Sequence, residues 1–305
     1  MSIPDRDMFV KGSAFTKKNH RDVYAAIDPT RPELSQAGKV VVITGATRGL
    51  GQLAFPASFA RAGAKAIAIL GRSADALAET KKVITEISPA TEVHAIVLDV
   101  LDEKAVAGAF DEIESRFGVP HVLVNNAGVL GPIAPTIETD IASWWNTQEV
   151  NVKGTLITTQ AFLRKTGPTP ASPTTILNMT SSGAVSLPPG MSAYSISKLA
   201  VVKFTSYLQS EHPTITSVTL NPGLVGTDMA HSVPFLVPFI GDTYELVGGV
   251  AVWLSSGDRA FLSGRALMAN WDVEELEARK QEIVEKDLLT ICYRGEFGGA
   301  DVVVE

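Results

Sequence analysis

The sequence has a single cysteine and no excess of positive charge among its 305 residues. One cysteine, Cys292, excludes an intrachain disulfide framework and a zinc site built from several thiolates, so no metal site is predicted. We expect Cys292 to be a small buried or half-buried side chain. Lysine and arginine number 26 against 33 aspartates and glutamates, a formal net charge of −7. No broad basic face is therefore expected, which argues against a dedicated role in binding nucleic acid.

Long apolar segments are also missing from the chain. No run of about 18 apolar residues occurs, so no membrane-spanning helix is predicted. The first 13 residues mix charged with isolated apolar side chains and lack the apolar core of a secretory signal. The last residues match no common sorting signal. We therefore expect a cytoplasmic protein.

What the sequence does contain is a series of short, near-continuous apolar runs rich in β-branched residues. They occupy residues 40–43, 66–70, 94–98, 121–124, 175–179 and 215–220. Runs of this kind are typical of strands covered on both faces, as in a parallel sheet. Each intervening segment is long enough for a helix. The pattern predicts an α/β fold: a single doubly wound Rossmann-fold domain with a parallel sheet of about seven strands flanked by helices.

Composition divides the chain into three zones. Residues 1–38 are polar and are interpreted as an N-terminal arm. Residues 39–270 hold the alternating strand and helix pattern, and we expect them to form the dinucleotide-binding and catalytic domain. Residues 271–305 are interpreted as a charged helix and a glycine-containing tail that pack on the body or on a partner subunit.

The charged helix of the last zone is expected to run from Asp272 to about Asp287. Asp272 with Glu275 resembles a capping box at its start. A narrow apolar stripe suited to docking is formed by Leu276, Ile283 and Val284.

A glycine-rich turn follows the first apolar run directly. Glycine at positions 45, 49 and 51 permits positive φ and close approach of the backbone to a pyrophosphate. The free N–H groups of the following helix then face the anion. A glycine triplet is weak evidence in a chain with 25 glycines, but its place after the first strand strengthens it. The residues expected to bind the cofactor here are Gly45, Thr47, Arg48, Gly49, Leu50 and Gly51; the alternative is a tight turn without a ligand.

Two arginines bear on the choice of cofactor. After the second strand, where an acidic residue would hold the ribose 2′-hydroxyl of NAD, the chain has Gly71 and Arg72. Arg48 is a second cation for the same region, and two guanidiniums suit a dianionic phosphate. The sequence thus predicts NADP(H) in preference to NAD(H), unless both arginines are merely solvated. Asp99, after the third strand, is expected at the adenine edge or in a plain turn.

Tyr194 and Lys198 form a Tyr-x-x-x-Lys motif, which places both side chains on one face of a helix. A free tyrosine has a pKa near 10, and a neighbouring ammonium should lower that pKa toward the working range. Ser181 lies thirteen residues earlier, just after the fifth strand, where its hydroxyl could bind a substrate carbonyl. Alone, the tyrosine and lysine would more often be a surface pair; their order after the glycine turn and the serine favours catalysis.

With these motifs in this order, the chain resembles the short-chain dehydrogenase/reductase family over residues 39–270. The matching motifs, in chain order, are Thr44-Gly-x-x-x-Gly-x-Gly51, Asp99, Asn125-Asn126-Ala127-Gly128, Asn151, Ser181, Tyr194-x-x-x-Lys198, Asn221-Pro222-Gly223 and Thr227. The combination is highly specific. The long flanks resemble a branch of the family found in fungi, often beside secondary-metabolite pathways.

The resemblance implies a role for each catalytic residue. Tyr194 would be the general acid in carbonyl reduction and the base in alcohol oxidation. Lys198 would bind the nicotinamide ribose and lower the Tyr194 pKa, and Ser181 would orient the carbonyl oxygen. Asn151 would hold a water that relays protons to Lys198. Residues implied to contact the cofactor are Asp99, Val100, Asn126, Ala127, Gly128, Pro222, Gly223, Val225 and Thr227, besides Tyr194, Lys198 and the glycine turn.

Several points stay open in the sequence. Alignment on Tyr194 selects Ser181, whereas the Ser-Gly junction favours Ser182. The apolar residues 229–241, here named the substrate loop, are interpreted as a lid over a hydrophobic substrate, or else as a core segment or an oligomer interface. His231 within it is interpreted as a polar loop residue. Residues 260–267 resemble the last strand of the family.

The predicted function is NADP(H)-dependent interconversion of a ketone or aldehyde and an alcohol on an apolar small molecule, such as a secondary-metabolite intermediate. An epimerase, dehydratase or C=C reductase of the same fold is one alternative, and a non-catalytic dinucleotide sensor is another. The expected partners are that substrate and a second copy of the chain, as a homodimer or homotetramer.

Overall fold

Seven parallel strands form the centre of the protein in a computed structural model that describes residues 5–167 and 173–293. Their order in the sheet is β3-β2-β1-β4-β5-β6-β7. The bounds are β1 Val40–Thr44, β2 Ala66–Gly71, β3 Glu92–Val97, β4 Val122–Asn125, β5 Thr175–Met179, β6 Thr216–Asn221 and β7 Ala266–Met268. The predicted α/β fold with a doubly wound parallel sheet of seven strands is confirmed.

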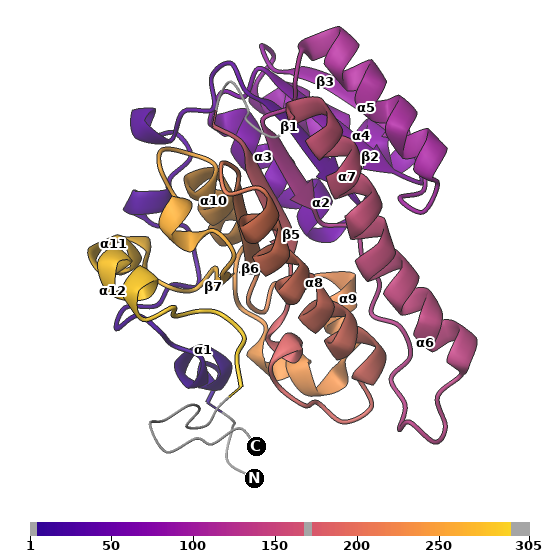
Figure 1. Ribbon diagram of the computed structural model, residues 1–305, viewed down its shortest axis with the longest axis vertical. Coiled ribbons are helices and arrows are strands. Elements are labelled where there is room, and N and C mark those ends of the chain that lie inside the picture. Colours follow the sequence, from indigo (N-terminus) through magenta and orange to yellow (C-terminus); the bar gives the residue numbers. More distant parts are fainter. Residues whose placement is uncertain (1–4, 168–172, 294–305) are drawn as a thin grey trace, which may run out of the picture.

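Helices cover both faces of this sheet (Figure 1). One face carries α3 (Phe55–Arg61), α4 (Ala74–Ile87) and α10 (Tyr244–Leu254), and the other carries α5 (Glu103–Phe117), α7 (Gly154–Thr166) and α8 (Ser192–Glu211). Because side chains alternate along a strand, Val41 and Ile43 enter the first core, while Val40 and Val42 enter the second. Phenylalanines from the helices pack against the sheet in both cores. The central strands are thus buried on both faces, which explains their near-continuous apolar runs.

The helix after the glycine turn is divided in two. The first part is α2 (Gly49–Leu53), and the second is α3, with Ala54 between them. Pro56 lacks an N–H group and its ring crowds the preceding turn, so a kink is expected at this point. The remaining helices near the sheet are α6 (Ile141–Gln148), a π-helical turn η3 (Glu149–Lys153) that leads into α7, and α9 (Asp228–His231). No described helix is long and apolar enough to cross a membrane.

Two strand predictions need correction. The third apolar run was expected to be covered on both faces, but β3 is an edge strand that begins at Glu92, and Val97 is exposed. An edge strand has a neighbour on one side only, which leaves part of its surface to solvent. The expected last strand, residues 260–267, starts as a 3-10 helix, η6 (Ala260–Leu262), and only Ala266–Met268 pairs with β6.

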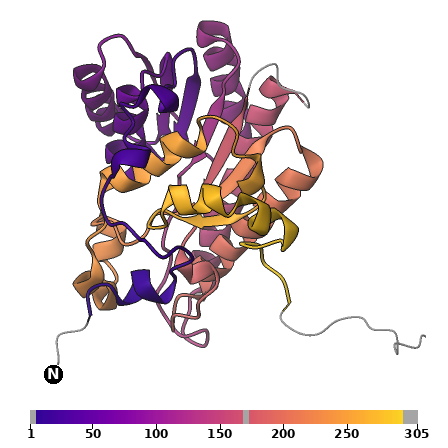
Figure 2. The ribbon, with the colours of Figure 1, turned by 90° about the vertical axis from the view of Figure 1, so that its left-hand side faces the viewer.

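The two flanks of the chain pack side by side on the same part of the body (Figure 2). The N-terminal arm contains α1 (Met8–Gly12) and two 3-10 helices, η1 (Ala25–Ile27) and η2 (Pro32–Leu34). Its Asn19 forms an antiparallel bridge with Trp271. Ile27 and Leu34 join the core on the α3 face. In the described part of the arm, the apolar side chains therefore add to an existing core; the three domain boundaries stay a prediction.

The C-terminal prediction is partly wrong. Instead of one helix to about Asp287 there are two, α11 (Val273–Ala278) and α12 (Lys280–Glu285). The break falls at Arg279, whose guanidinium lies 3.8 Å from the centre of the Phe15 ring and donates a hydrogen bond to the Phe15 carbonyl. The N-terminal arm thus fixes the turn between them. Leu276 and Ile283 are buried as predicted, but Val284 is exposed.

Cys292 is exposed, in contrast to the expected buried or half-buried position. It follows α12, beyond the apolar side chains that dock this flank on the body. The glycine-containing tail that the sequence predicts lies mostly outside the described residues.

Candidate active site

A cavity of about 280 Å³ opens where the parallel strands end. Its wall contains residues that directly follow β1 to β6, since the carboxyl ends of parallel strands meet at one edge of the sheet. The sequence-predicted residues that line it are Gly45, Thr47, Arg48, Gly49, Leu50, Arg72, Asp99, Val100, Asn126, Ala127, Gly128, Ser181, Tyr194, Lys198, Pro222, Gly223, Val225 and Thr227. Only Gly51 and Asn151 of the predicted set lie outside this wall.

The glycine turn is shaped by close backbone contacts. Gly45 has φ +64°, and a Cβ there would lie 2.7 Å from the Cα of Ala127. A Cβ at Gly51 would lie 2.2 Å from the carbonyl oxygen of Gly45, so Gly51 allows α2 to pack against the turn without itself reaching the cavity. The side-chain amide nitrogen of Asn126 donates hydrogen bonds to the carbonyls of Thr44 and Gly45, at 3.0 and 3.1 Å. The result is a glycine-lined stretch of backbone that a phosphate can approach closely.

The arginines lie at the β2 end of the cavity. Arg48 and Arg72 are both exposed and line the wall, and Arg72 Nη1 is 3.8 Å from the Asp99 carboxylate. Asp99 also accepts a hydrogen bond from the Leu101 amide, which is the turn-forming role that the sequence left open. The side chain of Thr47 covers Gly71, where a Cβ would lie 2.5 Å from the threonine methyl. This end of the cavity therefore places two exposed guanidiniums, one of them near Asp99, where they can reach an anion.

The catalytic candidates gather at the other end of the cavity, after β5 and on the first turns of α8. Lys198 is buried, and its ammonium donates a 2.9 Å hydrogen bond to the Met179 carbonyl. Its Nζ lies 5.6 Å from the centre of the Tyr194 ring. Ser181 Oγ accepts a hydrogen bond from the Gly183 amide at 3.2 Å. Ser181 lines the cavity, whereas Ser182 is exposed and does not.

Burial controls the titration of this pair. Burial raises the pKa of Tyr194 to about 12, and the Ser181 hydroxyl offsets only part of that rise. Burial lowers the pKa of Lys198 to about 8, because an ammonium loses its hydration there. In the protein by itself the pKa of Tyr194 is thus raised by burial, opposite to the lowering toward the working range that the sequence predicts; the effect of Lys198 on this pKa stays a prediction.

Asn151 lies in the π-helical turn η3, 1% exposed. Its amide oxygen accepts from the Val129 N–H at 2.8 Å, and its amide nitrogen donates to the Val129 carbonyl and to Ser197 Oγ, both at 2.9 Å. The side chain thus connects the loop after β4 to α8. A Cβ at Gly128 would come within 3.5 Å of both Asn151 Oδ1 and Lys198 Nζ. These contacts give Asn151 a bracing position; the water relay stays a prediction.

The substrate loop forms an apolar side of the cavity. It comprises α9 and a 3-10 helix, η5 (Pro234–Phe239), and its cavity-facing residues are Met229, Ala230, Val233 and Leu236. Thr227 caps α9 through a hydrogen bond from the Ala230 amide. His231 is exposed and its ring is hydrogen-bonded to the Thr227 carbonyl, as expected of a polar loop residue.

Several cavity residues were missed in the sequence. They are Gly71, Leu98, Val129, Leu130, Val150, Met179, Thr180, Met191, Asn221, Leu224 and Asp228. Most are neighbours of a recognised motif: Val129 and Leu130 follow the Asn-Asn-Ala-Gly segment, and Met191 precedes Tyr194 by one helical turn. Proximity to a motif was the only signal available for the apolar members of this set, because their side chains carry no chemistry of their own.

Comparison with known proteins identifies the family. The family model for short chain dehydrogenases matches residues 39–234. The short chain dehydrogenase mpl6 of Monascus purpureus is 39% identical over 286 residues, which cover 92% of this chain and 96% of the relative. The short chain dehydrogenase andI of Emericella variicolor is 35% identical, with the same coverage of both chains. The chain therefore belongs to the short-chain dehydrogenase family, and it is an oxidoreductase of that family.

Solved structures agree with this fold over the body of the chain. A short chain dehydrogenase of Escherichia coli CFT073 complexed with NADPH superposes with a TM-score of 0.72 at 25% identity, covering 78% of this chain and 99% of that one. A short chain dehydrogenase of Salmonella enterica gives the same TM-score at 26% identity, with 78% and 98% coverage. About a fifth of this chain thus lies outside the fold shared with these bacterial proteins, whereas the fungal relatives match most of it.

Proposed function

We propose that the protein is an NADP(H)-dependent oxidoreductase that interconverts a ketone or aldehyde and an alcohol on an apolar small molecule. The observation that carries this proposal is the arrangement of one cavity. Arg48 and Arg72 line its β2 end, and Ser181, Tyr194 and Lys198 line its β5 end. Since β2 and β5 are three strand spacings apart, the two ends lie about 14 Å from one another. An extended dinucleotide requires a separation of this order.

The backbone cradle fits such a cofactor. The glycine turn brings backbone close to the cavity where a side chain at Gly45 or Gly51 would collide with neighbouring backbone, and the two guanidiniums suit a 2′-phosphate. No acidic residue directly follows β2, where one would repel that phosphate. The nicotinamide dinucleotide, when bound, supplies or accepts the hydride. The E. coli neighbour, as an NADPH complex, is in line with this preference.

In the reduction direction, the chain's own groups orient the carbonyl and deliver a proton to it. A tyrosine with a pKa of about 12 keeps its proton at neutral pH, which is the form needed for a general acid. Ser181 would hold the carbonyl oxygen and stabilise the negative charge that develops there. Lys198, held by the Met179 carbonyl, would bind the ribose and favour the phenolate after proton transfer.

The walls around this end indicate the kind of substrate. Leu130, Met191, Met229, Val233 and Leu236 line it, and their side chains offer a substrate no hydrogen-bond donor and no acceptor stronger than a thioether sulfur. A hydrophobic small molecule gains free energy by burying its surface against such a wall. With fungal relatives of this length, a secondary-metabolite intermediate is the proposed substrate class.

A homodimer or homotetramer in the cytoplasm is the proposed assembly. Large apolar side chains are exposed on α6, α7 and α8: Trp145, Leu156, Ile196, Leu199 and Tyr207. An exposed apolar area shared by neighbouring helices is typical of a subunit contact. Light scattering should therefore give a mass of two or four chains, and a mass of one chain would refute this part.

The function is tested by two measurements on the full-length protein. NADPH fluorescence should change on titration with the protein, and NADH should bind more weakly. NADPH oxidation should then accompany the reduction of bulky apolar ketones, whereas small charged keto acids should be poor substrates. Binding without turnover over a broad ketone panel would favour the sensor alternative, and a failure to bind NADPH would refute the proposal.

A further inference from the structure

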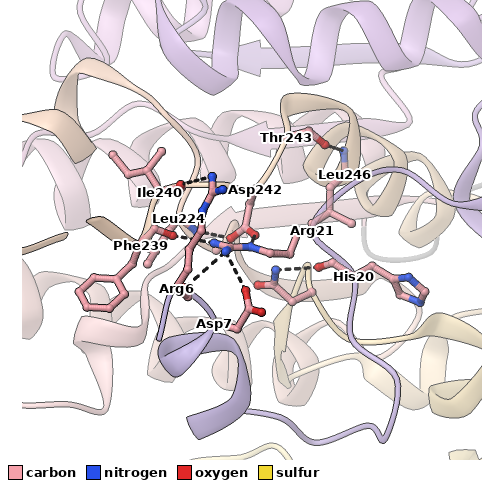
Figure 3. A network of polar contacts seen from close by, with 12 residues as sticks. Arg6, Asp7, His20, Arg21, Leu224, Phe239, Ile240, Asp242, Thr243 and Leu246 are labelled. Carbon is pink, nitrogen blue, oxygen red and sulfur yellow. Dashed lines mark hydrogen bonds and ion pairs between the residues drawn. The ribbon is translucent and has the colours of Figure 1, made fainter. Parts of the chain in front are cut away.

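The N-terminal arm contacts the end of the substrate loop through Arg21. Its Nε donates to Asp242 Oδ1 at 2.8 Å, and its Nη2 donates to the Phe239 carbonyl at 2.6 Å (Figure 3). A third contact joins Nη1 to the Asp7 carboxylate at 3.0 Å. Arg21 is half-buried, while the side chain of Asp242 is only 1% exposed. One guanidinium therefore ties two parts of the arm to the end of the substrate loop.

Asp242 connects Arg21 to residues of the cavity wall. Its second oxygen, Oδ2, accepts a 2.5 Å hydrogen bond from the Leu224 amide. The Asp242 amide donates to the Leu224 carbonyl at 3.1 Å, and Val225 forms a parallel bridge with Asp242. A Cβ at Gly223 would lie 2.3 Å from Oδ2, so the carboxylate packs directly on this turn. Gly223, Leu224 and Val225 all line the cavity.

Two further contacts hold the same end of the substrate loop. The Phe9 and Phe239 rings meet edge to face, with centroids 4.8 Å apart, and Phe239 is buried. Arg6 Nη2 donates to the Ile240 carbonyl at 2.9 Å. The arm thus grips residues 239–242, whereas the cavity-facing side chains of the loop all lie earlier, between positions 229 and 236.

We propose that Arg21 is a positioning residue, which sets the substrate loop and the Leu224 turn at the cavity and thereby sets the affinity for the apolar substrate. The buried Asp242 carboxylate needs a charged partner, and Arg21 is the cation that contacts it. Without Arg21, Asp242 loses that partner beside the Leu224 amide, and the loop end loses its hydrogen bond at Phe239. Among the described residues, neither Arg48 nor Arg72 contacts this network, which meets the cavity at Gly223, Leu224 and Val225. This inference rests on the proposed function for its kinetic part only.

The test compares Arg21→Gln with Arg31→Gln in the full-length protein. Arg31 belongs to the same arm but pairs with Glu33 and the Ala25 carbonyl, away from the loop, so this variant makes the same charge change as a control. For Arg21→Gln we expect the KM for the ketone to rise about tenfold, since small misplacements in a site have large effects. We expect kcat per NADPH-binding site to change by less than about threefold, because the contacts of Tyr194 and Lys198 are untouched. Arg21→Lys keeps the positive charge but loses the several N–H donors of the guanidinium, so its KM for the ketone should lie between those of the wild type and Arg21→Gln.

Amide hydrogen exchange gives a readout that does not need turnover. Exchange at residues 233–242 and 224–225 should accelerate in Arg21→Gln and remain at the wild-type rate in Arg31→Gln. A general loss of stability would instead accelerate exchange throughout the sheet and lower the activity per mole of total protein, while KM and kcat per NADPH-binding site stay unchanged, and that pattern overturns the inference. Unchanged local exchange overturns it too, as does faster exchange with an unaltered KM in an active enzyme. If the wild type neither binds nor oxidises NADPH, the proposed function fails, and local exchange alone decides whether Arg21 holds the loop.

Discussion

Replacing Lys198 with methionine should stabilise the folded protein at pH 7 while it abolishes turnover. The reason is that the ammonium is buried, and burial lowers its pKa from 10.5 to about 8. At about 1.4 kcal/mol per pKa unit, keeping this group charged in the folded state costs about 3 kcal/mol. The variant also loses the hydrogen bond to the Met179 carbonyl, worth about 1 kcal/mol. Since methionine retains much of the lysine's apolar stem, a net gain of about 2 kcal/mol is expected.

The sign of this effect depends on pH in a defined window. Below pH 8 lysine is charged in both folded and unfolded chains, and the wild type bears the full cost. Between pH 8 and 10.5 the unfolded chain binds the proton more strongly, so wild-type stability relative to the variant rises with pH. Above pH 10.5 the cost is gone and the wild type keeps its hydrogen bond. The advantage of the variant should therefore disappear across this window.

Urea unfolding at pH 7 and pH 10.5, without added nucleotide and at one protein concentration, measures the difference. Lys203→Met is the matched control, because Lys203 lies on the same helix but is exposed over the Tyr207 ring. Its stability difference from the wild type should not depend on pH over this window. Lys198→Met could instead be less stable than the wild type at both pH values and by the same amount. That result would refute the claim that burial of the Lys198 ammonium destabilises the folded protein at pH 7.

Three further predictions concern catalysis and cofactor choice. Tyr194→Phe should retain NADPH binding by fluorescence and lose about 10²–10⁴-fold in kcat, the usual contribution of a general acid; near-normal turnover would refute its role. Arg72→Asp should raise the KM for NADPH and lower that for NADH, because a carboxylate repels the 2′-phosphate and accepts from a 2′-hydroxyl; an unchanged ratio of the two would falsify the assignment. Ser181→Ala should reduce kcat by about 10²-fold, the scale of one lost oxyanion contact, and Ser182→Ala should not; equal effects would contradict the choice of Ser181.

The fold was predictable because the central strands, β1, β2, β4 and β5, are buried on both faces. Two-sided burial forces an uninterrupted apolar run such as residues 40–43, and that run is visible without coordinates. The glycine turn was predictable for a related reason, since the contacts at Gly45 and Gly51 leave no space for a side chain. Edges and ends were less predictable. The exposure of β3 and the break at Arg279 depend on neighbours that are distant in the sequence.

The sequence by itself determined the class of this protein and the residue types of its candidate site. Glycines at a turn, an arginine after the second strand, and a tyrosine and lysine one helical turn apart are local patterns, so they are legible in order along the chain. Only the tertiary structure decided how these groups are tuned. Burial reverses the expected shift of the Tyr194 pKa, and the contact of Arg21 with Asp242 joins positions 221 residues apart. Desolvation and long-range contact arise from three-dimensional packing, and no local pattern encodes them.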